Sequence, residues 1–162
     1  MAGIDPIRAG QPIVQRIREG TNETAALFIL RGHQRLCVLE ITAPHFLKIA
    51  RGVGETEHIS SGASGKAILA FMPEQEVEQI LRTLPRNNNR KQLLASLDRI
   101  RADGFAISRS EVFAGAVAIA APFFDHNRGV AGSIGVFGLQ ARLDRAWEDE
   151  ATRLVVRGAA DL

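Results

Sequence analysis

Residues 62–67, Gly-Ala-Ser-Gly-Lys-Ala, resemble a phosphate-binding loop at first sight. The pattern GxxxxGK[ST] needs glycine where this chain has Ser60, and serine or threonine where it has Ala67, so a nucleotide site is not indicated. A helix that starts here would still point backbone N–H groups outward, and such groups can bind a carboxylate or a phosphate. The small residues could equally serve only to let the helix pack closely on a sheet, and the sequence leaves both interpretations open.

The other reactive residue types favour no catalytic centre. The single cysteine, Cys37, lies among Leu36, Val38 and Leu39, which is typical of a small core residue. Glu111 follows a predicted strand and could be a pocket carboxylate, although an exposed loop acid is the favoured interpretation. No Gly-x-Ser-x-Gly motif is present. The four histidines lack the spacing of metal ligands: His33, His45, His58 and His126. We therefore expect no enzyme, no metal and no cofactor.

The composition is that of one globular domain. The 162 residues are 46% hydrophobic and 23% charged, with a net charge of only +2. The cations alternate with acids instead of gathering on one helix, as they do in DNA-binding domains. We therefore expect any DNA-reading part to lie outside this chain.

No segment indicates a membrane or an oxidising compartment. No apolar run approaches the roughly 20 residues that span a bilayer, and the first ten residues lack the apolar core of a signal peptide. One cysteine cannot form an intrachain disulfide. These features predict a cytoplasmic protein without membrane contact.

Hydrophobic periodicity predicts helices and strands in the order α-ββ(β)-ααα-βββ-α. Helices are expected at 11–20, 60–72 (with a serine N-cap), 73–84, 91–102 and 143–157, and strands at 25–30, 36–41, 45–50, 105–108, 117–124 and 130–137. Strands joined by tight turns, with helices grouped between two strand sets, favour an α/β (α+β) fold. Its centre would be an antiparallel sheet of about six strands flanked by helices.

Several motifs resemble those of one regulator family, in the same order along the chain. Residues 61–71 (SGASGKAILAF) are similar to "A-x-G-K-A-x-L-A", and residues 100–108 (IRADGFAIS) to "I-R-x-x-G-[YF]-A-x-S". Glu111, Gly115 and residues 118–125 (AIAAPFFD) resemble "E-x-x-x-G-x-x-x-I-A-A-P-[IV]-x-D", and residues 132–138 resemble the last core strand. The family is the isocitrate-lyase-regulator (IclR) family of bacterial transcription regulators. The resemblance implies a GAF/profilin-like, effector-binding domain over residues 1–162.

In that family the domain follows an N-terminal winged helix-turn-helix, which this chain lacks. The resemblance implies a small organic acid as effector, a homodimer or homotetramer, and DNA contact only through the attached domain. It also implies a pocket whose wall uses ten residues: Phe46, Ile49, Ala63, Ser64, Gly65, Ser108, Ala116, Ala118, Gly135 and Phe137.

The expected pocket departs from that of family members that bind small acids. Those members carry polar side chains near the places of Ser108, Gly135 and Phe137, including an acid at the first. Here a hydroxyl, no side chain and an aromatic ring stand instead, so we expect a larger, partly apolar or aromatic acid. Its carboxylate would bind backbone N–H groups near residues 63–65. Phe137 would instead face the core if the strand register slips by one residue. A GAF-like enzyme and a purely structural dimerisation module are the alternative functions.

Overall fold

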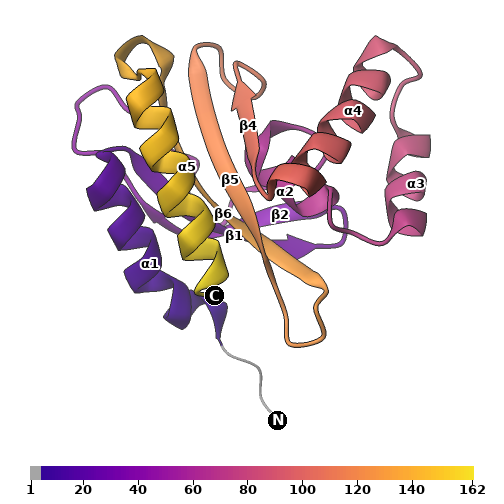
Figure 1. Ribbon diagram of the computed structural model, residues 1–162, viewed down its shortest axis with the longest axis horizontal. Coiled ribbons are helices and arrows are strands. Elements are labelled where there is room, and N and C mark those ends of the chain that lie inside the picture. The colour runs from indigo at the N-terminus through magenta and orange to yellow at the C-terminus, as the bar shows by residue number, and fades with distance from the viewer. Residues whose placement is uncertain (1–4) are drawn as a thin grey trace.

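A curled antiparallel sheet of six strands forms the centre of the computed structural model, which describes residues 5–162 (Figure 1). The strands are β1 (Thr24–Arg31), β2 (Gln34–Ile41), β3 (Thr56–His58), β4 (Ala106–Arg109), β5 (Ala116–Phe124) and β6 (Val130–Leu139). Their order across the sheet is β3-β2-β1-β6-β5-β4, so the first and last thirds of the chain meet where β1 pairs with β6. This arrangement confirms the predicted α+β architecture with an antiparallel sheet.

Helices cover both faces of the sheet. They are α1 (Pro6–Thr21), α2 (Gly62–Leu69), α3 (Glu74–Thr83), α4 (Asn88–Asp103) and α5 (Arg145–Ala160), with a short 3-10 turn, η1 (Gln140–Arg142), before the last. α1 and α5 lie side by side on one face, while α2 packs on the other with α4 and α3 beyond it (Figure 1). None of the helices in residues 5–162 has the length and hydropathy needed to cross a membrane.

Local sequence signals explain where the helices begin and end. The carboxylate of Asp5 accepts a hydrogen bond from the N–H of Ile7 at the start of α1, and Asp144 caps α5 in the same way. Gly104 ends α4 at a φ of 83°, a conformation that glycine adopts without strain, as expected from its position after the last apolar residue.

One predicted strand is wrong. Residues 45–50 form an irregular loop in which Phe46 and Leu47 are exposed, and the edge strand is the polar β3, whose Thr56 pairs with Leu36 of β2. The apolar run was a misleading signal because an edge strand is defined by backbone pairing with its neighbour and need not be apolar.

Candidate functional site

A narrow cavity lies where the start of α2 approaches the sheet. Strands β2, β4, β5 and β6 and the loops before β3 and β5 all contribute to its wall. The space between the wall atoms is about 380 Å³ with the mouth included, but only about 30 Å³ can hold the centre of a water-sized molecule. The wall consists of Arg35, Ile49, Arg51, Gly62, Ala63, Ser64, Ser108, Glu111, Val112, Phe113, Ala116, Ala118 and Phe137.

Groups of the chain itself bind the first N–H groups of α2. Ser61 stands at the N-cap position, as predicted, but its side chain makes no capping hydrogen bond. The N–H of Ala63 donates to the Ser108 hydroxyl (3.1 Å), and the N–H of Gly62 donates to the Glu111 carboxylate (3.4 Å). A carboxylate is stabilised at this end of a helix by the helix dipole. The N–H groups of Gly62 and Ala63, at the start of the expected anion site, therefore already have partners within the chain.

Glu111 also pairs with a lysine that is almost fully buried. Its second oxygen lies 2.6 Å from Nζ of Lys66, whose side chain is 10% exposed, while the Glu111 side chain is 34% exposed. Glu111 thus lies in an exposed loop, as the favoured interpretation expected, and its carboxylate also forms part of the cavity wall.

A buried arginine forms the polar floor of the cavity. Arg35 is 1% exposed, and its guanidinium donates to the carbonyl of His58 and, at 2.6 Å, to the Glu57 carboxylate. Burial lowers the pKa of Arg35 to about 10, and the charge of Glu57 opposes part of that shift. Within the described part of the chain, its Nε–H has no hydrogen-bond partner.

Two glycines, which lack side chains, leave the space that the Arg35 guanidinium occupies beneath α2. A Cβ added to Gly62 would lie 3.1 Å from Nη2 of Arg35, and one added to Gly65 would lie 2.6 Å from Nη1. Gly62 also adopts a φ of 76°, which side chains rarely tolerate. All residues of α2 from Gly62 to Leu69 are buried, so the segment shows the close packing that was one of its two open interpretations.

The remaining wall is apolar. Phe137 packs against Phe28, with ring centroids 6.2 Å apart, and it faces the cavity, so the register slip that would turn it away does not occur. The guanidinium of Arg51 lies 5.3 Å from the ring centroid of Phe113, a cation–π arrangement. Ala116 and Ala118 leave room beside these rings because their side chains are small.

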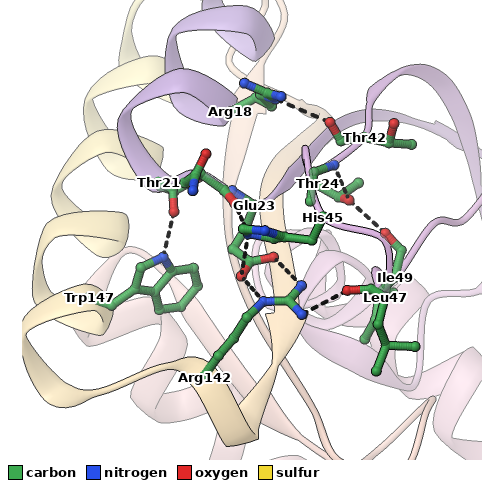
Figure 2. A network of polar contacts seen from close by, with 12 residues as sticks. Arg18, Thr21, Glu23, Thr24, Thr42, His45, Leu47, Ile49, Arg142 and Trp147 are labelled. Carbon is green, nitrogen blue, oxygen red and sulfur yellow. Dashed lines mark hydrogen bonds and ion pairs between the residues drawn. The ribbon is translucent and has the colours of Figure 1, made fainter.

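Both ends of the loop that carries Ile49 are hydrogen-bonded to the hydroxyl group of Thr24. The buried Thr24 donates to the carbonyl of Ile49 (2.6 Å) and accepts from the N–H of Ala43 (2.9 Å) (Figure 2). Residues 43–49 are therefore held as a closed loop at the edge of the cavity.

An ion pair anchors the middle of the same loop. Arg142 donates to both oxygens of Glu23, at 2.6 and 2.9 Å, and to the carbonyl of Leu47 at 2.7 Å (Figure 2). The bond to Glu23, whose side chain is 3% exposed, raises the pKa of Arg142 above its usual value. His45 reaches the carbonyl of Asn22 at the end of α1 (2.9 Å). The loop is thus bonded to residues that follow α1.

Seven of the ten predicted pocket residues line the cavity, and three do not. Phe46 is fully exposed on its loop, Gly65 packs against Arg35 and Ile59, and Gly135 lies against Ala120 of β5. Sequence reasoning missed Arg35, Arg51, Gly62, Val112 and Phe113. One signal was available for Arg35: it stands two residues before Cys37 in a strand, and the two side chains therefore share a face.

Cys37 is not a reactive nucleophile in this structure. It is 1% exposed, and burial, followed by the nearby charge of Glu40, raises the pKa of its thiol to about 12. Thiolate is the reactive form, so the group is protonated at neutral pH. Among residues 5–162, no three His, Cys, Asp or Glu side chains come together as metal ligands would.

The curled sheet with helices on both faces places the chain in the class of GAF-like α+β domains. Residues 2–162 match the family described as bacterial transcriptional regulator IclR C-terminal, and the chain belongs to this family. This confirms the resemblance seen in the motifs.

Two curated relatives are transcription regulators. The chain is 25% identical over 146 residues to the HTH-type transcriptional regulator KipR of Bacillus subtilis, covering 86% of this chain and 58% of that protein. It is 27% identical over 163 residues to BhcR of Paracoccus denitrificans, covering 96% and 58%. The chain thus spans somewhat more than half the length of these relatives. Membership of a family of regulators confirms that the chain is not an enzyme.

Solved structures share the fold. The chain superimposes on the Thermotoga maritima IclR with a TM-score of 0.89 at 23% identity, covering 98% of this chain and 67% of that one. A C-terminal domain from a Vibrio cholerae protein gives a TM-score of 0.84 at 27% identity, covering 96% and 95%.

Proposed function

We propose that this chain is the effector-sensing and oligomerisation domain of a bacterial transcription regulator. It binds a small organic acid in the cavity beneath the start of α2 and thereby changes the DNA affinity of an attached winged helix-turn-helix in the cytoplasm. The observation that carries the proposal is the cavity itself, whose wall combines arginine, hydroxyl and carboxylate groups with aromatic rings. Ligand sites are typically mostly apolar with a few convergent polar groups.

The effector enters by displacing part of the wall. Pockets for small ligands usually have volumes of about 300–1,000 Å³, well above the 30 Å³ free here. Val112 and Phe113 are 37% and 44% exposed and belong to an irregular loop, so they can move without opening the core. The space vacated by Phe113, next to Phe137 and the small Ala116, suits an apolar or aromatic acid.

The bound effector acts by shifting populations. A ligand changes a conformational equilibrium only through different affinities for the two states, and a typical coupling amounts to about 1–3 kcal/mol. The loop of residues 43–49 supports a mechanical connection between the cavity and the end of α1. Ile49 of this loop lines the cavity. His45 and Arg142 bond the same loop to Asn22 and Glu23, which follow α1. We expect the sensing unit to be a homodimer or homotetramer.

A thermal-shift screen of the purified chain against small carboxylic acids, from oxoacids to aromatic acids, tests the proposal. A ligand at a hundredfold excess over its Kd stabilises the folded state by about 2.7 kcal/mol, so an effector raises Tm. Ala116→Leu fills the cavity and should abolish the shift. The matched control Ala95→Leu, an exposed position on α4, should keep it. A panel without any hit would favour a purely structural dimerisation module, and a hit that survives Ala116→Leu would show that the ligand binds outside this cavity.

A further inference from the structure

The buried charges at the cavity do not balance. Arg35 and Arg51 both pair with the one carboxylate of Glu57, while Lys66 pairs with Glu111. These five side chains carry three positive and two negative charges. The nearby Glu40 carboxylate accepts its hydrogen bonds from the backbone N–H groups of Arg51 and Gly52. The side chains of Arg35 and Arg51 are only 1% and 9% exposed, so water does little to solvate the excess positive charge. Burying a charge without a partner is unfavourable, and proteins normally supply a counter-charge.

Two further features of Arg35 would make a bound anion favourable. The unpartnered donor, Nε of Arg35, belongs to a side chain of the cavity wall. The same guanidinium lies against Gly62 and Gly65 in the first turn of α2, at the positive end of the helix dipole, where a cation is disfavoured. The N–H groups of Gly62 and Ala63, in contrast, already donate to Glu111 and Ser108. The excess positive charge, which a bound anion would balance, therefore lies at the two arginines.

We infer that Arg35 and Arg51 bind the carboxylate of the effector, and that the effector is a monoanionic acid. The inference rests on the proposed sensing function and deepens it by naming the charge of the ligand and the groups that hold it. A guanidinium matches the planar carboxylate with two parallel N–H donors. One negative charge balances the excess, whereas a dianion would reverse it and would be repelled by Glu111. The apolar part of the acid then faces Phe113 and Phe137.

Matched acids and amides provide the probes. Thermal shifts of the purified chain are measured with sodium acetate against acetamide, and with sodium benzoate against benzamide, in sodium chloride at equal ionic strength. The acids should raise Tm and the amides, which have the same shape but no charge, should not. Arg51→Gln should weaken acid binding about tenfold or more, because a charged hydrogen-bond donor is lost.

Two variants set the direction of the effect, and one serves as a control. Glu57→Gln removes the carboxylate that competes for both arginines and should tighten acid binding severalfold. Arg35→Met removes the excess charge and should abolish the preference for acid over amide. Arg109→Gln breaks an ion pair with Glu148 outside the cavity, in which Arg109 is half exposed, and should not change acid binding. Should Arg35→Met fail to fold, the opposite effects of Arg51→Gln and Glu57→Gln still decide the matter.

The outcomes separate this inference from the proposed function. Amides that stabilise the chain as well as acids do, in a manner lost in Ala116→Leu, would overturn the monoanion while leaving a sensor of neutral ligands. Acid binding that is equal in the native chain, Arg51→Gln and Glu57→Gln would overturn the assignment of the arginines. The absence of any stabilisation, by these probes or by the wider panel, would overturn both proposals.

Discussion

The two faces of the sheet bury different chemistry. Under α1 and α5 the buried side chains are mainly apolar, with Ile119, Ile134 and Val136 of the sheet against Val14 and Val155 of the helices. On the face that carries the cavity, the buried polar and charged side chains include Arg35, Ser64, Lys66, Ser108 and Ser133. Apolar packing contributes most of the stability of a domain, whereas buried charge is retained where a ligand or a specific arrangement needs it. Both faces carry an apolar core, since Ile68, Leu69 and Leu97 are buried under α2 and α4 as well, but only the cavity face adds buried charges that are available for binding.

The largest effect is expected from opening a cavity in the apolar face. Ile119→Ala should lower the free energy of unfolding by about 2–5 kcal/mol, because a fully buried side chain is lost and its neighbours cannot close the space. Urea denaturation followed by circular dichroism measures the change. Ile107→Ala is the control: Ile107 pairs with Ile119 across β4 and β5 but is 37% exposed, and should cost less than about 1 kcal/mol. Equal losses at the two positions would contradict the view that close packing under α1 and α5 provides stability.

A smaller effect is expected when the same substitution is made in a helix on each face. A methyl group at Gly65 of α2 would lie 2.8 Å from the carbonyl oxygen of Ile59, and backbone cannot easily move away. At Gly158 of α5 the nearest atoms are the side-chain ends of Ile13 and Ile17, at 2.8 and 3.0 Å, which can rotate. Gly65→Ala should therefore cost about 1–3 kcal/mol.

Gly158→Ala should stay within about 1 kcal/mol of the native chain, because alanine favours the helix and offsets the crowding. Thermal unfolding of both variants under identical conditions measures the difference. A tolerated alanine at Gly65 would mean that α2 does not need its close approach to β3 and Arg35.

Regular elements on both faces were predictable from the sequence. The hairpin of β1 and β2, the three central helices and the last three strands follow from hydrophobic periodicity, which shows which side of each element is buried. Periodicity failed at residues 45–50, where Phe46 and Leu47 are exposed and hydrogen bonds from Thr24 and Arg142 hold the loop. Those bonds join positions far apart in the sequence, and no local pattern encodes them.

The same limit applies to the cavity. The motifs located the small wall residues, such as Ala63 and Ala118, because they belong to regular elements. Arg35 and Glu111 carry charges, and a charged residue in isolation is typical of an exposed surface. Only the folded chain brings the buried Arg35 beneath α2 and the Glu111 carboxylate to the first N–H group of that helix.

The smallest expected effect is a pH dependence of stability that arises from one residue on the cavity face. Cys37 lies on the cavity face beside Phe28 and Phe137, and its pKa of about 12 exceeds the value near 8.5–9 of an unfolded thiol. The native state therefore holds the thiol proton more tightly. Its contribution to stability is complete below about pH 8.5, and it declines as pH rises from there toward 12. Between pH 8 and 10 the loss should be about 1–2 kcal/mol.

Urea denaturation at both pH values, in the native chain and in Cys37→Ala, isolates the contribution of the Cys37 thiol because all other titrating groups are common to both proteins. Identical pH dependence in the two proteins would show that the Cys37 thiol is solvated in the folded state, and that the cavity face is more open than its packing indicates.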